Sequence, residues 1–318
     1  MWRHLRIAEL YNVVNKTIVM EKVKVILLLF VFTLPVVASS QSKMLIKGVE
    51  FTGAFGLTYF SGDLGGGKKN YVNLQMQTLN FAFGGGIRYF ISNRFAVRGN
   101  IYYGRLSSDD AVSGDRYRRA RNLNFRSDIA DFSFQLEYSI INWNVKESNK
   151  KLYRRIINDK HNIYVFTGLS FFRFHPYGEY SGQWYSLPEL STSGQGLPGG
   201  PAPYKLSSFS IPMGVGYKYL IGKKYSIGFE IVFRKTFTDY IDDVSGPYYD
   251  NDLLRQHKGD LAADIADKNI GREGIKFPAG ATRGNPNMND NFAFILITIN
   301  KRLNLFRSGK KDIPCAYE

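Results

Sequence analysis

The sequence has few of the residues from which disulfides, metal centres and catalytic sites are usually built. Its 318 residues include one cysteine, Cys315, and four histidines. A single cysteine makes no internal disulfide framework and no cysteine-rich metal site. The GxSxG and HExxH motifs of common hydrolases are also missing. We therefore expect a non-enzymatic protein with no cofactor, no metal site and no small-molecule substrate.

Long hydrophobic runs are absent from most of the chain. Beyond residue 40, no segment has the roughly 18 unbroken apolar residues that a transmembrane helix needs. The basic excess, 42 Lys and Arg against 27 Asp and Glu, is dispersed along the chain. No zinc-finger or RNA-binding motif accompanies these charges, so we expect no nucleic-acid partner.

The first 40 residues contain the pattern of an export signal. From Met20 the chain has two lysines, an apolar run over 25–37 and then three small residues. This order is typical of a secretory signal peptide, and a short buried helix is the weaker alternative. We expect 1–40 to be a signal peptide whose true start is Met20. A barrel would then occupy 41–306 and a periplasmic basic tail 307–318.

Several segments alternate apolar and polar residues with a period of two, which indicates β-strands with two different faces. In KYSIGFEIVFRKTF, residues 224–237, aromatic and aliphatic residues alternate with small and charged ones, and only Val232 breaks the pattern. Many such segments have the ~9–11 residues that a tilted membrane strand needs. Eight strands are expected, near 50–60, 79–90, 94–104, 132–141, 161–175, 208–219, 224–237 and 290–303.

The connections between these strands alternate between short and long. Strands two and three, and strands six and seven, are joined by tight turns, and strands four and five by a modest basic stretch. All long loops therefore fall at one end of the sheet, as in outer-membrane barrels. The sequence predicts an all-β fold: a closed eight-stranded antiparallel transmembrane β-barrel with long outer loops and short periplasmic turns, surrounded by outer-membrane lipids. The long links are about 61–77, 107–125, 176–205 and 238–289.

A secreted, soluble β-sandwich is the main structural alternative, because its strands also have one apolar and one polar face. The asymmetry of the loops and the number of alternating strands favour the barrel. Pro212 removes a backbone donor inside a paired strand, so we expect a β-bulge there. Aromatic residues near strand ends suit the interfacial girdles of a membrane barrel. They include Tyr89, Phe90, Tyr102, Tyr103 and Tyr225.

Charged residues occupy the polar rows of several strands. The interior of an eight-stranded barrel is just wide enough for side chains to fill, and unpaired charges there are costly. We expect these residues to pair with one another and to plug the lumen, so the protein is not expected to be a porin. This lumen charge cluster comprises Arg88, Arg98, Glu137, Lys218, Glu230 and Arg234.

The third and fourth long loops carry a candidate loop binding surface. Trp184 and Tyr185 either anchor a partner or pack beneath the third loop. Asp239, Asp242 and Asp243 open the fourth loop, but their spacing does not match an EF-hand. Solvated turns are favoured over calcium binding for these aspartates.

His175 lies near the loop end of the fifth strand and is the basis of the enzymatic alternative. An acid–base pair between His175 and an aspartate of the fourth loop can be imagined. The sequence fixes no geometry for such a pair, so this alternative is the weaker one.

Six stretches together resemble the family of outer-membrane β-barrel proteins that includes PorG, of the type IX (Por) secretion system. The resemblance extends over most of the chain after the signal, and the last stretch is fairly specific. It implies an accessory outer-membrane component that associates with periplasmic ring proteins of that machine. The stretches are FSGDLG (60–65), RNLNFRSDI (121–129), FTGLSFFRFHP (166–176), GQWYSLPEL (182–190), SIPMGVGYKY (210–219) and RKTFTDYIDDVSGPYYD (234–250).

The expected function is therefore that of a structural or interaction component of protein secretion. The periplasmic partner surface would lie on the basic turn, with Lys150, Lys151, Arg154 and Arg155, and on the tail from Arg307 to Lys311. The alternative function is a surface binding protein or adhesin that works through its long loops.

Overall fold

The structure of the chain is a computed structural model, and it describes residues 48–64, 78–92, 94–141, 160–222, 224–269 and 275–304. The chain divides into two compact units, Met1–Leu45 and Ile46–Glu318. All described residues belong to the second unit. The expected signal peptide and basic tail lie outside the described residues.

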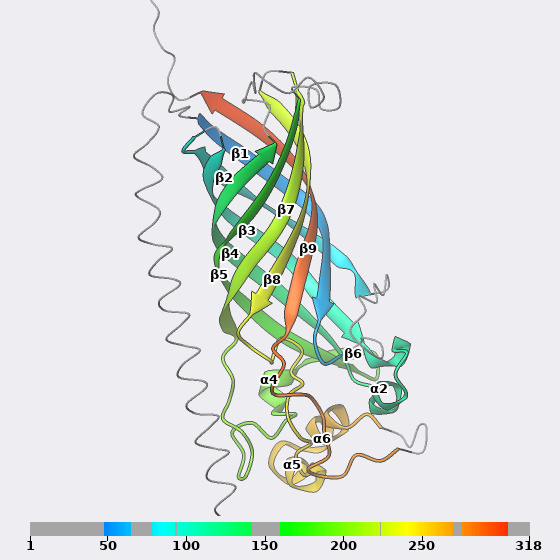
Figure 1. Cartoon of the computed structure of the whole chain (residues 1–318). Helices are drawn as coiled ribbons and strands as arrows, with labels where there is room; N and C mark the ends of the chain where they lie inside the picture. The colour runs from blue at the N-terminus through cyan, green and yellow to red at the C-terminus, as the bar shows by residue number, and fades with distance from the viewer. Residues whose placement is uncertain are drawn as a thin grey trace, which may run out of the picture. The chain divides into compact units, whose positions relative to one another are not determined.

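Eight antiparallel strands form a closed barrel (Figure 1). Each strand pairs with the next one around the wall, and the barrel closes because β1 pairs with both β2 and β9. The prediction of an eight-stranded barrel is confirmed. The strands are β1 (Gly48–Ser61), β2 (Asn80–Phe90), β3 (Phe95–Asp109), β4 (Asn124–Ile141), β5 (His161–Tyr180), β7 (Ser207–Ile221), β8 (Tyr225–Thr236) and β9 (Asn291–Asn304).

A ninth strand, β6 (Gln183–Ser186), was not expected from the sequence. It pairs with the last residues of β5, Tyr177 to Tyr180, beyond the point where β5 pairs with β7. The hairpin therefore extends one side of the wall past the rim of the barrel. Two of its residues, Trp184 and Tyr185, belong to the third long loop, where we expected no strand.

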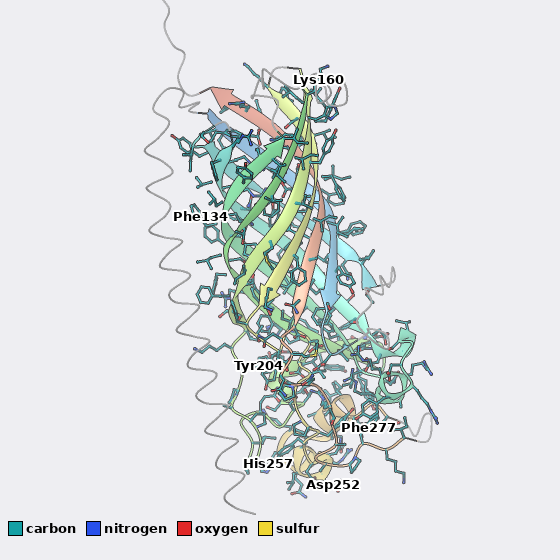
Figure 2. The ribbon with its side chains drawn as sticks, viewed as in Figure 1. Phe134, Lys160, Tyr204, Asp252, His257 and Phe277 are labelled. Atoms are coloured by element: carbon teal, nitrogen blue, oxygen red, sulfur yellow. The ribbon has the colours of Figure 1, made fainter. Side chains whose placement is uncertain are left out.

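The wall of the barrel is apolar on the outside and polar on the inside through most of its height. Phe81 and Leu169 are 69% and 68% exposed on the outer face, and Phe134 also projects outward (Figure 2). Along β8, exposed and buried positions alternate without a break. An apolar outer face on a closed sheet is the architecture of transmembrane β-barrels, because every backbone group is paired within the wall.

Two of the five residues expected in the aromatic girdles point into the barrel instead of toward its outer face. Phe90 and Tyr102 are buried inside the barrel, whereas Tyr89, Tyr103 and Tyr225 are exposed on its outer face. Both exceptions are direct sequence neighbours of outward-facing tyrosines. Because side chains alternate along a strand, both members of such an aromatic pair cannot face lipid.

Pro212 does not produce the expected bulge. The register between β7 and β8 is continuous through the pair Pro212–Arg234. The pairing of β7 with β5 lapses instead between Met213 and Ser210, where the missing N–H would have donated, and it resumes in the same register. The register shift that the structure records lies between β4 and β5, at Ser139 and Ile141.

The short helices of the long loops all lie at one end of the barrel (Figure 1). The ends of β1 and β9 that lead to the chain termini, Gly48 and Asn304, pair with each other at the opposite end. In the described part of the chain, no helix has the length and apolar content to cross a membrane. The loop helices are η2 (Asp110–Val112), α2 (Arg116–Arg121), α4 (Leu187–Leu190), α5 (Asn251–Lys258) and α6 (Asp260–Ala266).

Replacing Phe134 with arginine should test whether the outer face contacts lipid. A cation at mid-height on the lipid side of such a barrel costs roughly 2–4 kcal/mol in a bilayer. We expect Phe134→Arg to lower the unfolding free energy in phospholipid vesicles by this amount relative to Phe134→Ala, which removes the ring without adding charge. Equal stability of the two variants would contradict lipid contact at this position.

Candidate functional site

The centre of the lumen is filled by a network of charged side chains. Arg88 Nε donates to Glu137 Oε2 at 2.8 Å, and another of its nitrogens pairs with Glu50. Arg98 Nη1 lies 2.7 Å from Glu230 Oε1, and Lys218 Nζ lies 3.0 Å from Glu50 Oε1. Every one of these side chains is buried. The structure thus brings five of the six predicted cluster residues into one network.

Arg234, the sixth predicted residue, lies in a separate pair. Its Nη2 and Nε reach the two carboxylate oxygens of Asp131 at 2.7 and 3.1 Å. Ser170 also donates to Asp131. Two-point contact between a guanidinium and a carboxylate fixes the orientation of both side chains.

Two anions that complete the lumen, Glu50 and Asp131, are absent from the predicted cluster. Glu50 stands directly across from Arg88 in the pairing of β1 with β2. Asp131 lies two residues before Ser133, in the same inward row of β4. The parity of β4 could have identified Asp131 had the strand been extended by one position. With both included, four buried cations face four buried anions.

Aromatic rings cover the charged network. Tyr164 donates its hydroxyl to Glu230 Oε1 at 2.5 Å, and its ring lies 4.9 Å from Lys218 Nζ. A Cβ atom at Gly216 would overlap this ring, so glycine is required there. Arg98 lies 3.8 Å from the ring centre of Phe166. Charge pairing and ring packing together make this part of the lumen a plug rather than a water-filled channel.

Removing one member of the network should be costly, because its partner is left buried and uncompensated. We expect Glu230→Gln to lower the free energy of unfolding by about 3–5 kcal/mol. Asp128→Asn breaks the exposed pair between Asp128 and Arg105 on the outer wall and should cost less than about 1 kcal/mol. Urea titrations of the protein in lipid vesicles measure both, and similar losses for the two variants would contradict the proposed energetics.

The aspartates at the start of the fourth loop are buried, so their expected place on a loop binding surface is wrong. Asp242 and Asp243 are fully buried and Asp239 nearly so. Asp242 accepts backbone N–H groups from Leu64 and Val244 at 3.2 and 2.9 Å. The cause is that the long loops pack against each other at the mouth of the barrel, which spacing within one loop does not reveal.

Asp243 joins the third loop to the fourth. It accepts from the hydroxyl of Tyr204 at 2.6 Å and from Thr192. Arg283 donates to the Asp243 carbonyl at 2.6 Å and to Ser193 Oγ at 2.7 Å. The side chain of Asp243 therefore holds loops together and is not available to a ligand from outside.

Arg121 makes the matching connection for the other loops. Its guanidinium bonds to both oxygens of Asp110 at 2.7 and 3.0 Å, to the Asp63 carbonyl at 2.8 Å and to the Arg283 carbonyl. All four long loops are consequently tied into one loop layer. In the described ranges, no three His, Cys, Asp or Glu side chains group as a metal site.

Trp184 and Tyr185 are half-buried rather than free anchors. Trp184 lies under the guanidinium of Arg126, whose central carbon is 4.2 Å from a ring centre. Tyr185 packs against the main apolar cluster, which contains side chains of both the barrel and the loops. The contacts therefore favour the alternative that these rings pack beneath the third loop.

His175 meets a serine rather than an aspartate of the fourth loop. Its Nε2 lies 2.9 Å from Ser186 Oγ. Asp128, which stands across from His175 in the pairing of β4 with β5, already holds Arg105 through both oxygens, at 2.6 and 3.2 Å. Among the described residues no group bonds to Nδ1 of His175, so this dyad has no orienting third member.

The predicted periplasmic partner surface lies outside the described residues. Lys150, Lys151, Arg154 and Arg155 belong to the turn between β4 and β5, and the tail follows β9. The surface stays a prediction.

Burial raises the pKa of several carboxyl groups in the loop layer. It raises the pKa of Asp239 from 3.8 to about 7, and the charge of Asp63 adds to this shift. Burial and then Asp63 raise the pKa of Asp242 well above its ordinary value. Burial, then Asp242 and Asp239, do the same for the pKa of Asp290. The folded loop layer therefore favours protonated carboxyl groups at this point.

Raising the pH should loosen the loop layer. A carboxyl group whose pKa is higher in the folded state contributes stability at low pH, and this stability is lost as the pH rises through the folded value. We expect opening of the fourth loop to become easier between pH 5 and pH 8, because Asp239 has a pKa of about 7. Hydrogen exchange of loop peptides, corrected for the intrinsic effect of pH, measures this.

Asp239→Asn mimics the protonated carboxyl group and should flatten the pH dependence. Asp252→Asn is the matched control, because Asp252 is exposed in α5 and close to His257 at the far side of the loop layer (Figure 2). Its pH profile should follow that of the unmodified protein. An unchanged profile in Asp239→Asn would contradict the assignment.

Comparison with known families identifies the chain. The model of the family described as "Domain of unknown function (DUF6089)" matches residues 24–264. The chain belongs to the DUF6089 family. No curated protein matches this DUF6089 protein.

Solved structures similar to the DUF6089 protein are outer-membrane proteins. Ail of Yersinia pestis is 10% identical with a TM-score of 0.36, over 81% of this chain and 99% of Ail. OprG of Pseudomonas aeruginosa is 7% identical with a TM-score of 0.35, over 81% of this chain and 96% of OprG. A major outer membrane protein of Thermus thermophilus is 9% identical with a TM-score of 0.36, over 80% and 99% of the two chains. At these values the strand pairings, not the similarities, define the barrel.

Proposed function

We propose that this DUF6089 protein is a non-enzymatic barrel of the bacterial outer membrane that acts by contact with other proteins, as a structural component of protein secretion. The plugged lumen is the observation that carries this proposal. Four buried cations and four buried anions occupy the space through which a solute would pass. A barrel that does not conduct must act through its surfaces or its ends.

The outer face supports the membrane location. It carries rows of exposed aromatic and aliphatic side chains, for example Phe229, Ile231 and Phe233 on β8. Soluble proteins rarely expose apolar patches of this extent. A leader with the pattern of an export signal would bring the protein to that membrane.

The assignment to secretion rests on the resemblance to the PorG-containing family, and its partners would be periplasmic ring proteins. These partners would meet the end of the barrel at which β1 begins and β9 ends. Basic residues of the turn between β4 and β5 and of the tail would supply the contacts. A complementary acidic surface on the partner would favour this docking.

Co-purification from outer membranes tests the partner surface. One variant lacks 307–318 and carries Gln at Lys150, Lys151, Arg154 and Arg155. We expect it to insert normally, to lose its periplasmic partners and to reduce the set of secreted proteins. Retention of every partner by this variant would contradict the surface.

The loop layer favours a second function, that of a surface binding protein or adhesin. Its loops form an ordered body with apolar clusters of their own, such as Leu254 with Ala262 and Ala266. A variant whose loop layer is replaced by short turns separates the two functions. Secretion should survive this exchange if the periplasmic end is the working surface, and adhesion or binding should be lost if the loops are.

A further inference from the structure

Toward the loop end of β3, β4 and β5 the two faces of the wall exchange character: charged side chains point outward and apolar ones point inward. Along β4, Phe132 and Phe134 face outward, but nearer the loops Phe125 faces inward and its neighbour Arg126 outward. Along β5, Phe171 and Arg173 both lie on the outer face, while Phe174 is buried inside. The strands therefore continue beyond the apolar band, and the inversion marks its edge.

Basic side chains gather on the outer face just past this edge. Arg173 follows Phe171 by one outward position on β5, and Arg105 follows Tyr103 in the same way on β3. Arg126 lies four residues beyond Ala130, the residue of β4 that stands across from Arg173. We call Arg105, Arg126 and Arg173 the arginine edge. Asp128 lies among them, and both of its oxygens are bonded to Arg105. A second carboxylate, Glu179, lies one outward position past Tyr177, the residue across from Arg126.

Arg173 is the residue of the arginine edge whose side chain has no partner among the described residues. Its side chain is exposed, and no described residue forms a hydrogen bond or an ion pair with it. The residues directly across from it on β4 and β7, Ala130 and Ser207, are both small. Neither neighbouring strand therefore places a large side chain directly across from the guanidinium.

Arg126 is held in position by aromatic rings. Its guanidinium carbon lies 4.2 Å from a ring centre of Trp184 on β6 and 5.9 Å from that of Tyr177 on β5. Stacking fixes the plane of a guanidinium and leaves its edge N–H groups free to bond an anion. The short strand β6 thus supplies the platform for a second cation of the arginine edge.

We propose that Arg173 and Arg126 each bind a phosphate group of anionic lipid in the leaflet at the loop end of the barrel. Guanidinium groups bond phosphate through two parallel N–H groups. A cation placed one outward position beyond the apolar band, as Arg173 is, lies at the level of lipid headgroups. This assignment depends on the proposed membrane location and adds the chemistry that the outer edge recognises.

Binding of a phosphorylated lipid tests this assignment on the whole protein. The probe is bisphosphorylated lipid A, titrated into the detergent-solubilised protein and counted by native mass spectrometry, with dephosphorylated lipid A as the matched lipid. We expect the phosphorylated form to bind at least about tenfold more tightly, and salt to reduce this preference. Equal affinity for the two lipids would overturn the assignment.

Variants locate the binding residues. Arg173→Gln should weaken binding of bisphosphorylated lipid A by roughly tenfold, and Arg126→Gln combined with it should weaken binding further. Lys224→Gln is the control, because Lys224 is an exposed cation at the opposite end of the barrel. Unchanged affinity in Arg173→Gln would also overturn the assignment. This single variant breaks no hydrogen bond or ion pair among the described residues, so it should fold even if loss of the Trp184 stack disturbs the double variant.

Insertion separates this inference from the proposed location. If the unmodified protein fails to enter bilayers of phosphatidylcholine, the membrane location is wrong. If it inserts but does not discriminate between the two forms of lipid A, the location stands and the arginine edge is not a phosphate site.

Discussion

Closure of the sheet is the constraint on which the rest of the structure depends. Pairing between β1 and β9 leaves no open edge in the wall, so the outer face can be apolar without exposing backbone groups. The same closure encloses a narrow interior in which charges must be matched. Glu50, on the first strand, meets Arg88 on β2 and Lys218 on β7, far along the chain. The long-range charge pairs inside the barrel and the apolar outer face thus both follow from closure of the sheet.

Much of the fold could be predicted from the sequence, because membrane strands have a simple period. Where the outer face of the wall is apolar, the alternation of apolar and polar residues in the sequence identified the strand and its two faces. This is the case on β8 and on the second half of β4. The first half of β4 was missed because its pattern inverts: Phe125 and Ile129 point inward against the loop layer. The strand β6 was missed because four residues are too few to show a period.

The candidate site was predictable only in part. The six charged residues of the lumen follow from strand parity, but which of them pair depends on the register of strands far apart in the chain, which no local pattern contains. Because local patterns do not contain long-range contacts, the burial of the aspartates in the fourth loop could not be predicted either. Asp242 and Asp243 look solvated in sequence, yet they are buried by partners such as Leu64 and Thr192 from other loops. Hydrogen bonds across loops, rather than composition, decide their roles.

The matched charges of the lumen have a consequence for assembly. Glu230 arrives on β8, near the end of the chain, and meets Arg98 on β3 and Tyr164 on β5 only when the wall is complete. A sheet of β1 to β4 alone would hold two of these cations, Arg88 and Arg98, with three of the anions, Glu50, Asp131 and Glu137. Its charges would therefore be unmatched, and no closed wall would surround them. Every incomplete intermediate is therefore penalised relative to the finished barrel, so the hairpins should enter the bilayer as one cooperative step rather than one after another.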